Sequence, residues 1–330
     1  MSSVTVVLLV KNGARYLREV VASVQAQHTH HRVRLLAIDS GSTDASLEIL
    51  SQGHVETTRI PATEFNHGDT RNLGVTLAGS STDFVVFLTQ DATPADGSWL
   101  ANLVEPLVQD LRVAGAFSRH IARPGSSPAL VRQLNESWQT GQVLRIVKEM
   151  PEARSVYERD RLYYAYFSDT SSAIRRSVWE AHPFPRTDFG EDAAWADRVL
   201  IAGFRIVFEP ASRVIHSHDY PLLEQFRQNV DHSAGMRQLF PSSVGRGAGE
   251  WLRALGGVPA QALADVRYMR LPRFSSAPLG QRVLWAVHSP LWHMASLAGS
   301  WLGAQLHRLH PRYRILVSRQ ERQRRVTRLT

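Results

Sequence analysis

The sequence predicts an α/β protein built on a doubly wound sheet. Residues 4–10 and 84–88 are near-continuous apolar runs, typical of strands buried on both faces. Residues 14–26 instead carry apolar side chains at helical spacing, and further strands and helices alternate between the two runs. A βαβαβ alternation of this kind predicts parallel strands with helices on both faces of the sheet.

The individual elements follow in chain order. We expect strands at 4–10, 34–38 and 84–88, and helices at 14–26, through Leu47 to Leu50, and at 71–77. Beyond residue 115 the pattern loosens. It predicts a helix over 129–148, an aromatic strand over 163–167, a helix over 191–202, and a strand over 204–208 that ends at Pro210. The Gly- and Ser-rich stretch 241–257 is typical of a linker.

Charge and composition separate a main domain, residues 1–240, from a C-terminal region, residues 241–330. The net charge is +8, and residues 307–330 hold eight arginines against one acid, so the preceding residues carry only about +1. Residues 283–306 are uncharged and contain Trp285, Trp292 and Trp301. With the Arg-rich tail, they favour a helical segment that docks on an anionic membrane. A helical pair packed on the main domain is the alternative.

Composition also limits the function classes. The chain has no cysteine, which excludes disulfides, thiol nucleophiles and Cys-ligated zinc and suits a reducing compartment such as the cytoplasm. Its first ten residues lack the basic region of a signal peptide and fit a first strand better. A nucleic-acid-binding protein acting through the Arg tail is a minor alternative. The nearly neutral main domain shows no reader motif, so we expect no nucleic-acid partner.

Carboxylates and imidazoles directly follow several predicted strands. Asp39 and Asp91 each end an apolar run, and His216 and His218 follow another. Ligands of open α/β sheets bind outside the carboxyl ends of strands. Asp39 can accept a hydrogen bond from a base or a ribose, and Asp91 can hold a metal and through it a phosphate. Alternation puts both histidines on one face, where one can join Asp91 around Mn²⁺ or Mg²⁺. The alternative is that Asp91 only begins a turn.

Two polar stretches precede predicted helices. Arg71, on a first helical turn, can reach a diphosphate or a base carbonyl, the alternative being a surface ion pair with Asp69. Glu191 and Asp192 begin the helix that follows Gly190, where the helix dipole stabilises carboxylates. One of these two acids is a candidate general base for an acceptor hydroxyl.

These pieces, in this order, resemble family 2 glycosyltransferases of the GT-A fold over roughly residues 3–235. Within that family, residues 65–68, 87–92 and 171–176 look most like bacterial rhamnosyltransferases, which build O-antigen and related glycans from dTDP-L-rhamnose. The resemblance is carried by Val10-Lys11-Asn12-Gly13, Ile38-Asp39-Ser40-Gly41-Ser42-Thr43-Asp44, Thr70-Arg71-Asn72-Leu73-Gly74, Leu88-Thr89-Gln90-Asp91, Gly190-Glu191-Asp192 and His216-Ser217-His218.

The resemblance implies a role for each matching residue. Asp91 matches the last acid of the Asp-x-Asp metal motif, with His218 as a further metal or diphosphate contact. Asp192 matches the catalytic base, with Glu191 supporting it. The donor site would be lined by Val10, Asn12, Asp39, Asn66, His67, Arg71, Gln90 and Asp91. One departure stands out, because Thr89 replaces the first acid of the metal motif.

The implied activity is the inverting transfer of L-rhamnose from dTDP-β-L-rhamnose. The implied acceptor is a glycan or a polyprenyl-linked sugar of a bacterial surface polysaccharide, at the cytoplasmic face of the inner membrane. The same fold with a UDP-hexose donor is the first alternative, and a glycan-binding protein with weakened catalysis, motivated by Thr89, is another. The oligomeric state stays open, an oligomer included.

Overall fold

The computed structural model describes residues 1–187, 189–241 and 248–322. The chain forms two compact units, the first from residues 1–123 and 135–216, the second from residues 124–134 and 217–330. The domain boundary expected after residue 240 therefore lies inside the second unit.

A mixed sheet forms the centre of the first unit. Among the described residues it has nine strands in the order β3-β2-β1-β4-β8-β6-β9-β5, with β7 also paired to β9. Only β8 and the short strands β5 and β7 run antiparallel to their neighbours. The strands are β1 (Ser3–Val10), β2 (Arg32–Asp39), β3 (Glu56–Arg59), β4 (Phe84–Thr89), β5 (Thr93–Pro94), β6 (Val113–Ile121), β7 (Ile146–Lys148), β8 (Ser171–Arg175) and β9 (Arg205–Ile215).

Strand direction decides which loops meet. Strand β8 is antiparallel to both β4 and β6, and β6 is parallel to β9, so β4, β6 and β9 all point the same way. Their carboxyl ends therefore lie along one edge of the sheet, together with those of β1 and β2 and with the residues that enter β8. This edge carries the candidate site.

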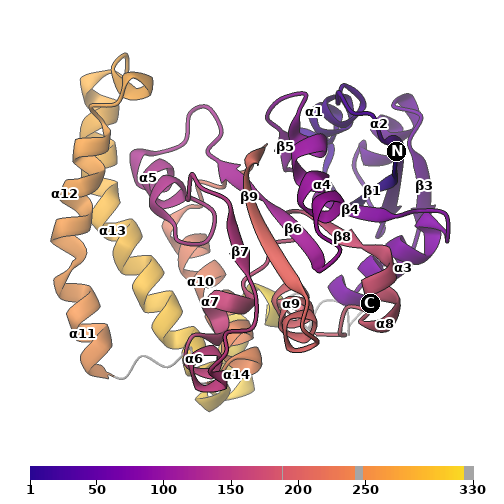
Figure 1. Cartoon of the computed structure of the whole chain (residues 1–330). Coiled ribbons are helices and arrows are strands. Elements are labelled where there is room, and N and C mark those ends of the chain that lie inside the picture. The colour runs from indigo at the N-terminus through magenta and orange to yellow at the C-terminus, as the bar shows by residue number, and fades with distance from the viewer. Residues whose placement is uncertain (188, 242–247, 323–330) are drawn as a thin grey trace. The chain divides into compact units, whose positions relative to one another are not determined.

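Helices cover both faces of the sheet, as the doubly wound prediction requires (Figure 1). Apolar side chains of one face pack with α1 (Ala14–Gln25), α2 (Ser46–Gln52) and α4 (Trp99–Gln109). The other face packs with α3 (His67–Ala78), α8 (Arg176–Ala181) and α9 (Glu191–Ile201). The predicted α/β class and its N-terminal strands and helices are confirmed.

Two predicted elements are wrong. The helix expected over 129–148 is only α5 (Pro128–Glu136), followed by a turn and by β7. Val143 and Leu144, which extended the apparent period, are 71% and 76% exposed and mark no buried face. The aromatic stretch 163–167 belongs mostly to α7 (Arg161–Ala165), which follows α6 (Arg154–Arg159). Its rings gather around a buried lysine instead of alternating across a sheet.

Strand β9 does not end at Pro210. Its register with β6 shifts between the pairs Ser118–Glu209 and Arg119–Arg213, so Pro210 lies in an irregularity of the ladder. A proline lacks the N–H that a regular ladder position needs and is tolerated at a bulge. The strand consequently continues to Ile215 and delivers His216 to the edge of the sheet.

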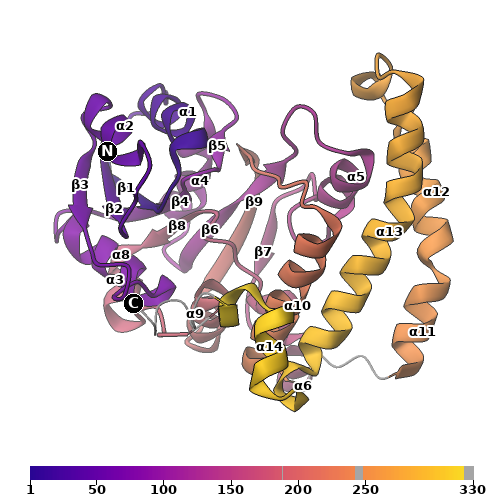
Figure 2. The same ribbon diagram turned by 180° about the vertical axis from the view of Figure 1, so that it is seen from behind.

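The second unit is helical (Figure 2). Its glycines Gly299 and Gly303 let α13 approach α10 closely, because a Cβ at either would lie 2.3 Å from a carbonyl oxygen of Phe226 or Val230. Buried Asp265 joins further segments by bonding Arg132, Ser289 and His293. The helices are α10 (Leu222–Leu239), α11 (Ala248–Gly256), α12 (Val258–Tyr268), α13 (Leu279–Ala304) and α14 (Pro311–Val317).

Two C-terminal expectations need correction. The expected linker 241–257 contains α11. Trp292, expected at a membrane surface, is 6% exposed. The beginning of the Arg tail is folded, with Ser318 and Arg319 bonded to Asp231 of α10, whereas Arg324, Arg325 and Arg328 lie outside the described residues. Within the described part of the chain, no helix is both long and apolar enough to cross a bilayer.

Candidate active site

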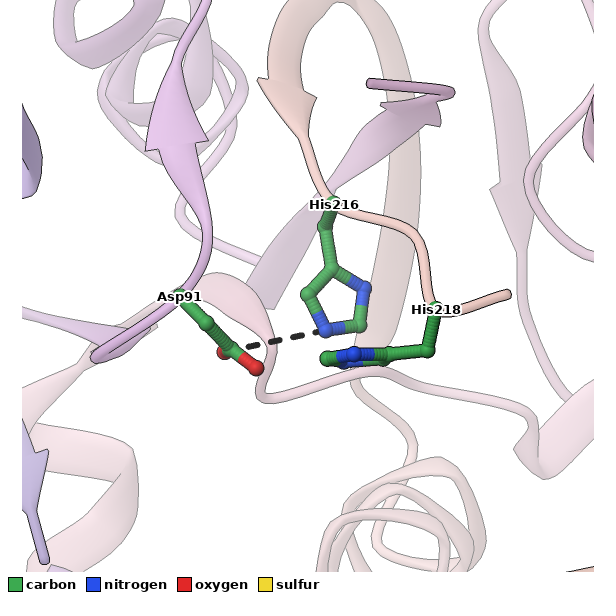
Figure 3. Close-up of side chains that lie close together, drawn as sticks. All are labelled: Asp91, His216 and His218. Carbon is green, nitrogen blue, oxygen red and sulfur yellow. Dashed lines mark ion pairs between the residues drawn. The ribbon is translucent and has the colours of Figure 1, made fainter. Parts of the chain in front are cut away.

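Asp91, His216 and His218 lie close together at the edge of the sheet (Figure 3). Asp91 Oδ1 is 3.7 Å from His216 Nε2, and both side chains are about four-fifths buried. His218 lies only two residues beyond His216, so the chain itself keeps it near. One ligand atom of each residue lies within 4.8 Å of the others. One carboxylate and two imidazoles suit Mn²⁺ better than Mg²⁺, which prefers oxygen ligands.

Neighbouring residues of β6 and the loop after it support this group, and the sequence analysis missed them. Arg123 donates from Nη2 to the carbonyl oxygen of Asp91 at 2.6 Å, and its guanidinium lies 3.8 Å from the Tyr16 ring centre. The ring of buried His120 lies 5.3 Å from that of His216. Burial lowers the pKa of His120 to about 3, and the neighbouring His216 contributes. The only sequence signal was their position at the end of an apolar run.

Asp39 is fully buried at the carboxyl end of β2. Its Oδ1 accepts hydrogen bonds from the N–H groups of Gly41 and Ser42, both at 3.1 Å. Its Oδ2 has no hydrogen-bond partner among the described residues. A buried carboxylate oxygen of this kind favours a ligand that donates an N–H or O–H.

The loop after β1 is fastened to the loop after β2. The N–H groups of Asn12, Gly13 and Ala14 donate to Ser42 Oγ, Ser46 Oγ and Asp44 Oδ2 at 2.9, 2.8 and 3.0 Å. In return, Asn12 Oδ1 accepts from the N–H of Thr43 at 2.8 Å. These three amides, which lead into α1, are therefore used within the protein.

Gln90 and Val10 hold the neighbouring strand ends. Gln90 Oε1 accepts from the N–H of Lys11 at 2.7 Å, and its Nε2 donates to the Lys11 carbonyl at 3.0 Å. Val10 is buried in the core, and its carbonyl accepts from the N–H of Ser40 at 2.9 Å. The residue between Thr89 and Asp91 thus fastens β4 to the loop after β1.

A buried ion-pair cluster lies beneath the start of α9. Arg71 is 5% exposed, and its Nε lies 2.7 Å from Asp169 Oδ2 while its Nη1 lies 2.5 Å from Glu191 Oε1. The other oxygen of Asp169 accepts from Ser172 Oγ at 2.6 Å. Arg71 thus pairs with two buried acids instead of forming the surface pair with Asp69, which contacts Arg186.

Asp192 is the third acid of this cluster. Its Oδ2 accepts from the N–H of Asp169 at 3.3 Å. Burial raises the pKa of Asp192, and the charges of Glu191 and Asp169 raise it further. Burial also raises the pKa of Asp169, against the opposing charge of Arg71. A carboxyl with a raised pKa is a stronger base once ionised, which suits proton abstraction.

Two predicted donor-site residues have local roles. Asn66 caps α3, accepting from the N–H groups of Gly68 and Asp69, and it donates to the carbonyl of Thr187 at 2.9 Å. His67 is exposed, with its ring 4.8 Å from that of Phe65. The structure therefore brings Asp91 together with His218, and Arg71 together with Glu191 and Asp192. Asp169, which the sequence analysis missed, had one signal, as an acid after an aromatic run.

Comparison with known proteins identifies similar chains. A model of the family described as "Glycosyl transferase family 2" matches residues 5–180. The O-antigen chain rhamnosyltransferase RfbN of Salmonella typhimurium is 29% identical over 231 residues, which cover 69% of this chain and 70% of the relative. The O-antigen chain rhamnosyltransferase WbaN of Salmonella anatum is 31% identical over 207 residues, 62% of this chain and 63% of the relative.

Solved structures show the fold. The mannosyltransferase PcManGT from Pyrobaculum calidifontis, in complex with GDP-Man and Mn²⁺, matches with a TM-score of 0.55 and 18% identity over 92% of this chain and 86% of its own. Glucosyl-3-phosphoglycerate synthase from Mycobacterium tuberculosis matches with a TM-score of 0.50 and 18% identity over 73% of this chain and 80% of its own. The mixed sheet is thus the GT-A fold that the sequence predicts.

The acid cluster makes a prediction for stability against pH. The pKa of Asp192 in the folded state is raised above the unfolded value of about 4, so the folded state binds the proton more tightly. The free energy of unfolding therefore falls as the pH rises from the unfolded pKa to the folded pKa. We expect Asp192→Asn to raise the free energy of unfolding by about 1–2 kcal/mol at pH 8 and by much less at pH 4.5. Chemical denaturation at both values measures this.

Asp160→Asn is the matched control. Asp160 is exposed, and its pKa is lowered by a hydrogen bond from Arg159, so its loss gives no gain at pH 8. An Asp192→Asn protein that is no more stable at pH 8 than the native one would contradict the raised pKa.

The histidine–carboxylate group makes a prediction for metal binding. Asp91→Ala and His216→Ala should each weaken Mn²⁺ binding by roughly tenfold or more, because each removes one ligand atom from the group. Calorimetric titration with Mn²⁺ alone measures it. His30→Ala, which removes an exposed histidine elsewhere, should bind as the native chain does. Equal Mn²⁺ affinities in the native protein and in all three variants would exclude this group as the metal site.

Proposed function

The chain belongs to glycosyl transferase family 2, and on that premise we propose that it transfers L-rhamnose from dTDP-β-L-rhamnose in the synthesis of a bacterial surface polysaccharide. The acceptor in this proposal is a glycan or a polyprenyl-linked sugar. The two O-antigen chain rhamnosyltransferases that resemble it support this choice. The observation that carries the chemistry is Asp192, a half-buried acid with a raised pKa at the start of α9.

Asp39 is the proposed contact for the base of the donor. Its Oδ1 is held by two backbone amides, and its Oδ2 is buried without a partner among the described residues. The N3–H of thymine is a donor that would satisfy this oxygen. Uracil and guanine also carry a ring N–H, so Asp39 is compatible with dTDP without choosing between dTDP and UDP.

The diphosphate needs a positive partner, and the amides of Asn12, Gly13 and Ala14 are already used within the protein. Asp91, His216 and His218 would hold Mn²⁺ at the neighbouring strand ends. Such an ion, when bound, offsets the charge that develops on the leaving diphosphate. Two histidines thus compensate for the acid that Thr89 replaces.

Asp192 is the proposed general base. Its ionised carboxylate takes the proton of an acceptor hydroxyl while the hydroxyl oxygen forms a bond to the anomeric carbon. The bond from that carbon to the diphosphate oxygen breaks, and its electron pair leaves with the nucleotide. Attack from the face opposite the nucleotide inverts the configuration, so a β-linked donor gives an α-rhamnoside. Glu191 and Asp169, paired with Arg71, hold this acid in place.

A peripheral position at the cytoplasmic face of the inner membrane completes the proposal. Helix α13 exposes Leu279, Val283, Leu284, Val287, Leu291 and Met294. Arg267, Arg270, Arg273 and Arg282 flank this apolar stripe, and Asp265, the one acid in the sequence between residues 258 and 306, is buried. An apolar helical surface bordered by cations suits an anionic bilayer.

The activity has a direct test. Incubation with dTDP-β-L-rhamnose, Mn²⁺ and a rhamnose-terminated acceptor should yield an α-linked product by NMR, and UDP-glucose should yield less. Asp192→Asn should lower kcat by roughly a thousandfold and leave dTDP affinity unchanged, because the base contacts the acceptor and not the nucleotide. Exposed Asp160→Asn should retain full activity. Retained turnover in Asp192→Asn would exclude it as the base, and preferred use of UDP-glucose would favour the UDP-hexose alternative.

The membrane surface is tested by co-sedimentation with vesicles. Val287→Glu and Leu291→Glu should reduce binding to anionic vesicles by roughly tenfold, because they place charge in the apolar stripe. Leu111→Glu, at a residue 79% exposed in the first unit, should bind as the native chain does. Equal sedimentation of native and variant proteins would exclude the α13 surface.

A further inference from the structure

Trp138 and Tyr163 form an exposed aromatic surface on the first unit. Each is 42% exposed, and in the described part of this unit they are the aromatic residues among its exposed large apolar side chains. Their ring centres lie 5.7 Å apart, and the ring of Tyr166 lies 5.5 Å from that of Trp138. We call these three residues the aromatic platform. Large amphipathic rings held at a surface are typical of recognition sites.

A buried lysine fixes the platform from within. Lys148, 5% exposed on β7, donates from Nζ to the carbonyls of Tyr163 and Tyr166 at 2.7 and 3.3 Å. Its Nζ lies 5.0 to 6.0 Å from the ring centres of the three platform residues, within the range of cation–π attraction for the protonated amine, and burial lowers the pKa of Lys148 to about 7. The rings are therefore ordered before any ligand arrives, which lowers the entropy cost of binding.

The platform is also fastened to the helix that begins with the proposed base. Tyr163 lies on α7, whose Arg161 bonds Asp197 of α9 through Nε and Nη2 at 2.6 and 2.5 Å. Tyr157 donates its hydroxyl to the same Asp197 at 2.8 Å. Asp192 lies in the first turn of α9, so the distance between platform and base is set by side chains that are already bonded.

Tyr166 belongs to the platform through its ring, which lies against Trp138. Burial raises the pKa of its phenol, and the charge of Asp192 raises it further. The phenol therefore stays protonated over the working pH range and can donate a hydrogen bond.

We propose that the aromatic platform binds the terminal sugar of the acceptor glycan. A pyranose has one face of C–H groups that stacks on Trp138 and Tyr163, while its hydroxyls point to the side and reach Tyr166 and Asp192. This inference rests on the proposed function, because it assigns the acceptor to the same site. The expected ligand is a pyranoside whose ring presents such a C–H face.

The test measures sugar binding without donor or turnover. Saturation-transfer NMR on the full chain, with methyl α-L-rhamnopyranoside and methyl α-D-mannopyranoside as probes, should show transfer to ring C–H protons of at least one sugar. Trp138→Ala and Tyr163→Ala should each reduce that transfer by roughly fivefold or more, and Trp138→Phe should restore most of it. Tyr313→Ala, which removes a 61% exposed ring of the second unit, should leave it unchanged.

Two results would overturn the platform as the acceptor site. One is no transfer to either sugar in the native protein, and the other is equal transfer in native and Trp138→Ala proteins of the same melting temperature.

In a turnover assay, Trp138→Ala should raise the acceptor KM by roughly tenfold and leave the donor KM unchanged. Failure of the proposed donor is separate, because it abolishes turnover of dTDP-rhamnose but leaves the sugar signals of the native protein in place.

Discussion

One buried guanidinium supports three carboxyl groups at the centre of this site. Arg71 pairs with Asp169 and Glu191, and Asp192 lies on the same cluster through the backbone of Asp169. Burial raises the pKa values of Asp192 and Asp169, and a single positive charge cannot neutralise the three acids of the cluster, so protons are held more tightly there. Removal of Arg71 would leave buried acids without a cation, which is far costlier than the loss of a surface pair. The proposed base, the loop entering β8 and the start of α9 all depend on this residue.

Much of the sheet could be predicted from sequence because its strands are buried on both faces. The apolar runs at 4–10 and 84–88 have no other explanation in a chain of this composition, and they became β1 and β4. The failures have local causes. Val143 and Leu144 continue an apolar period while exposed, and the tyrosines near residue 164 surround Lys148, a contact between segments that no local pattern reveals. From sequence alone Pro210 predicts a strand end, because the irregularity that tolerates it depends on the register with β6.

The candidate site also contains residues that the sequence could place and residues that it could not. Asp39, Asp91 and His218 follow strands, so their positions came from the fold rule that strand ends meet. Asn66 and Gln90 stay predicted donor contacts, and the structure shows that their side chains also cap α3 and hold the Lys11 backbone. Whether an amide bonds its own chain or a ligand depends on which backbone groups come within about 3 Å, and spacing does not encode that. Asp169 and Lys148 matter through partners distant in sequence, so no motif marked them.

The Gln90 contact also constrains how this chain can change. A Cβ at Gly13 would lie 2.5 Å from Gln90 Oε1, a distance no real pair of such atoms adopts. A larger residue at position 13 is therefore blocked while Gln90 keeps its two bonds to Lys11. A shorter residue at position 90 removes the block and releases the loop after β1 at the same time. The two positions are therefore coupled in one direction, and related chains with a larger residue at position 13 should also differ at position 90.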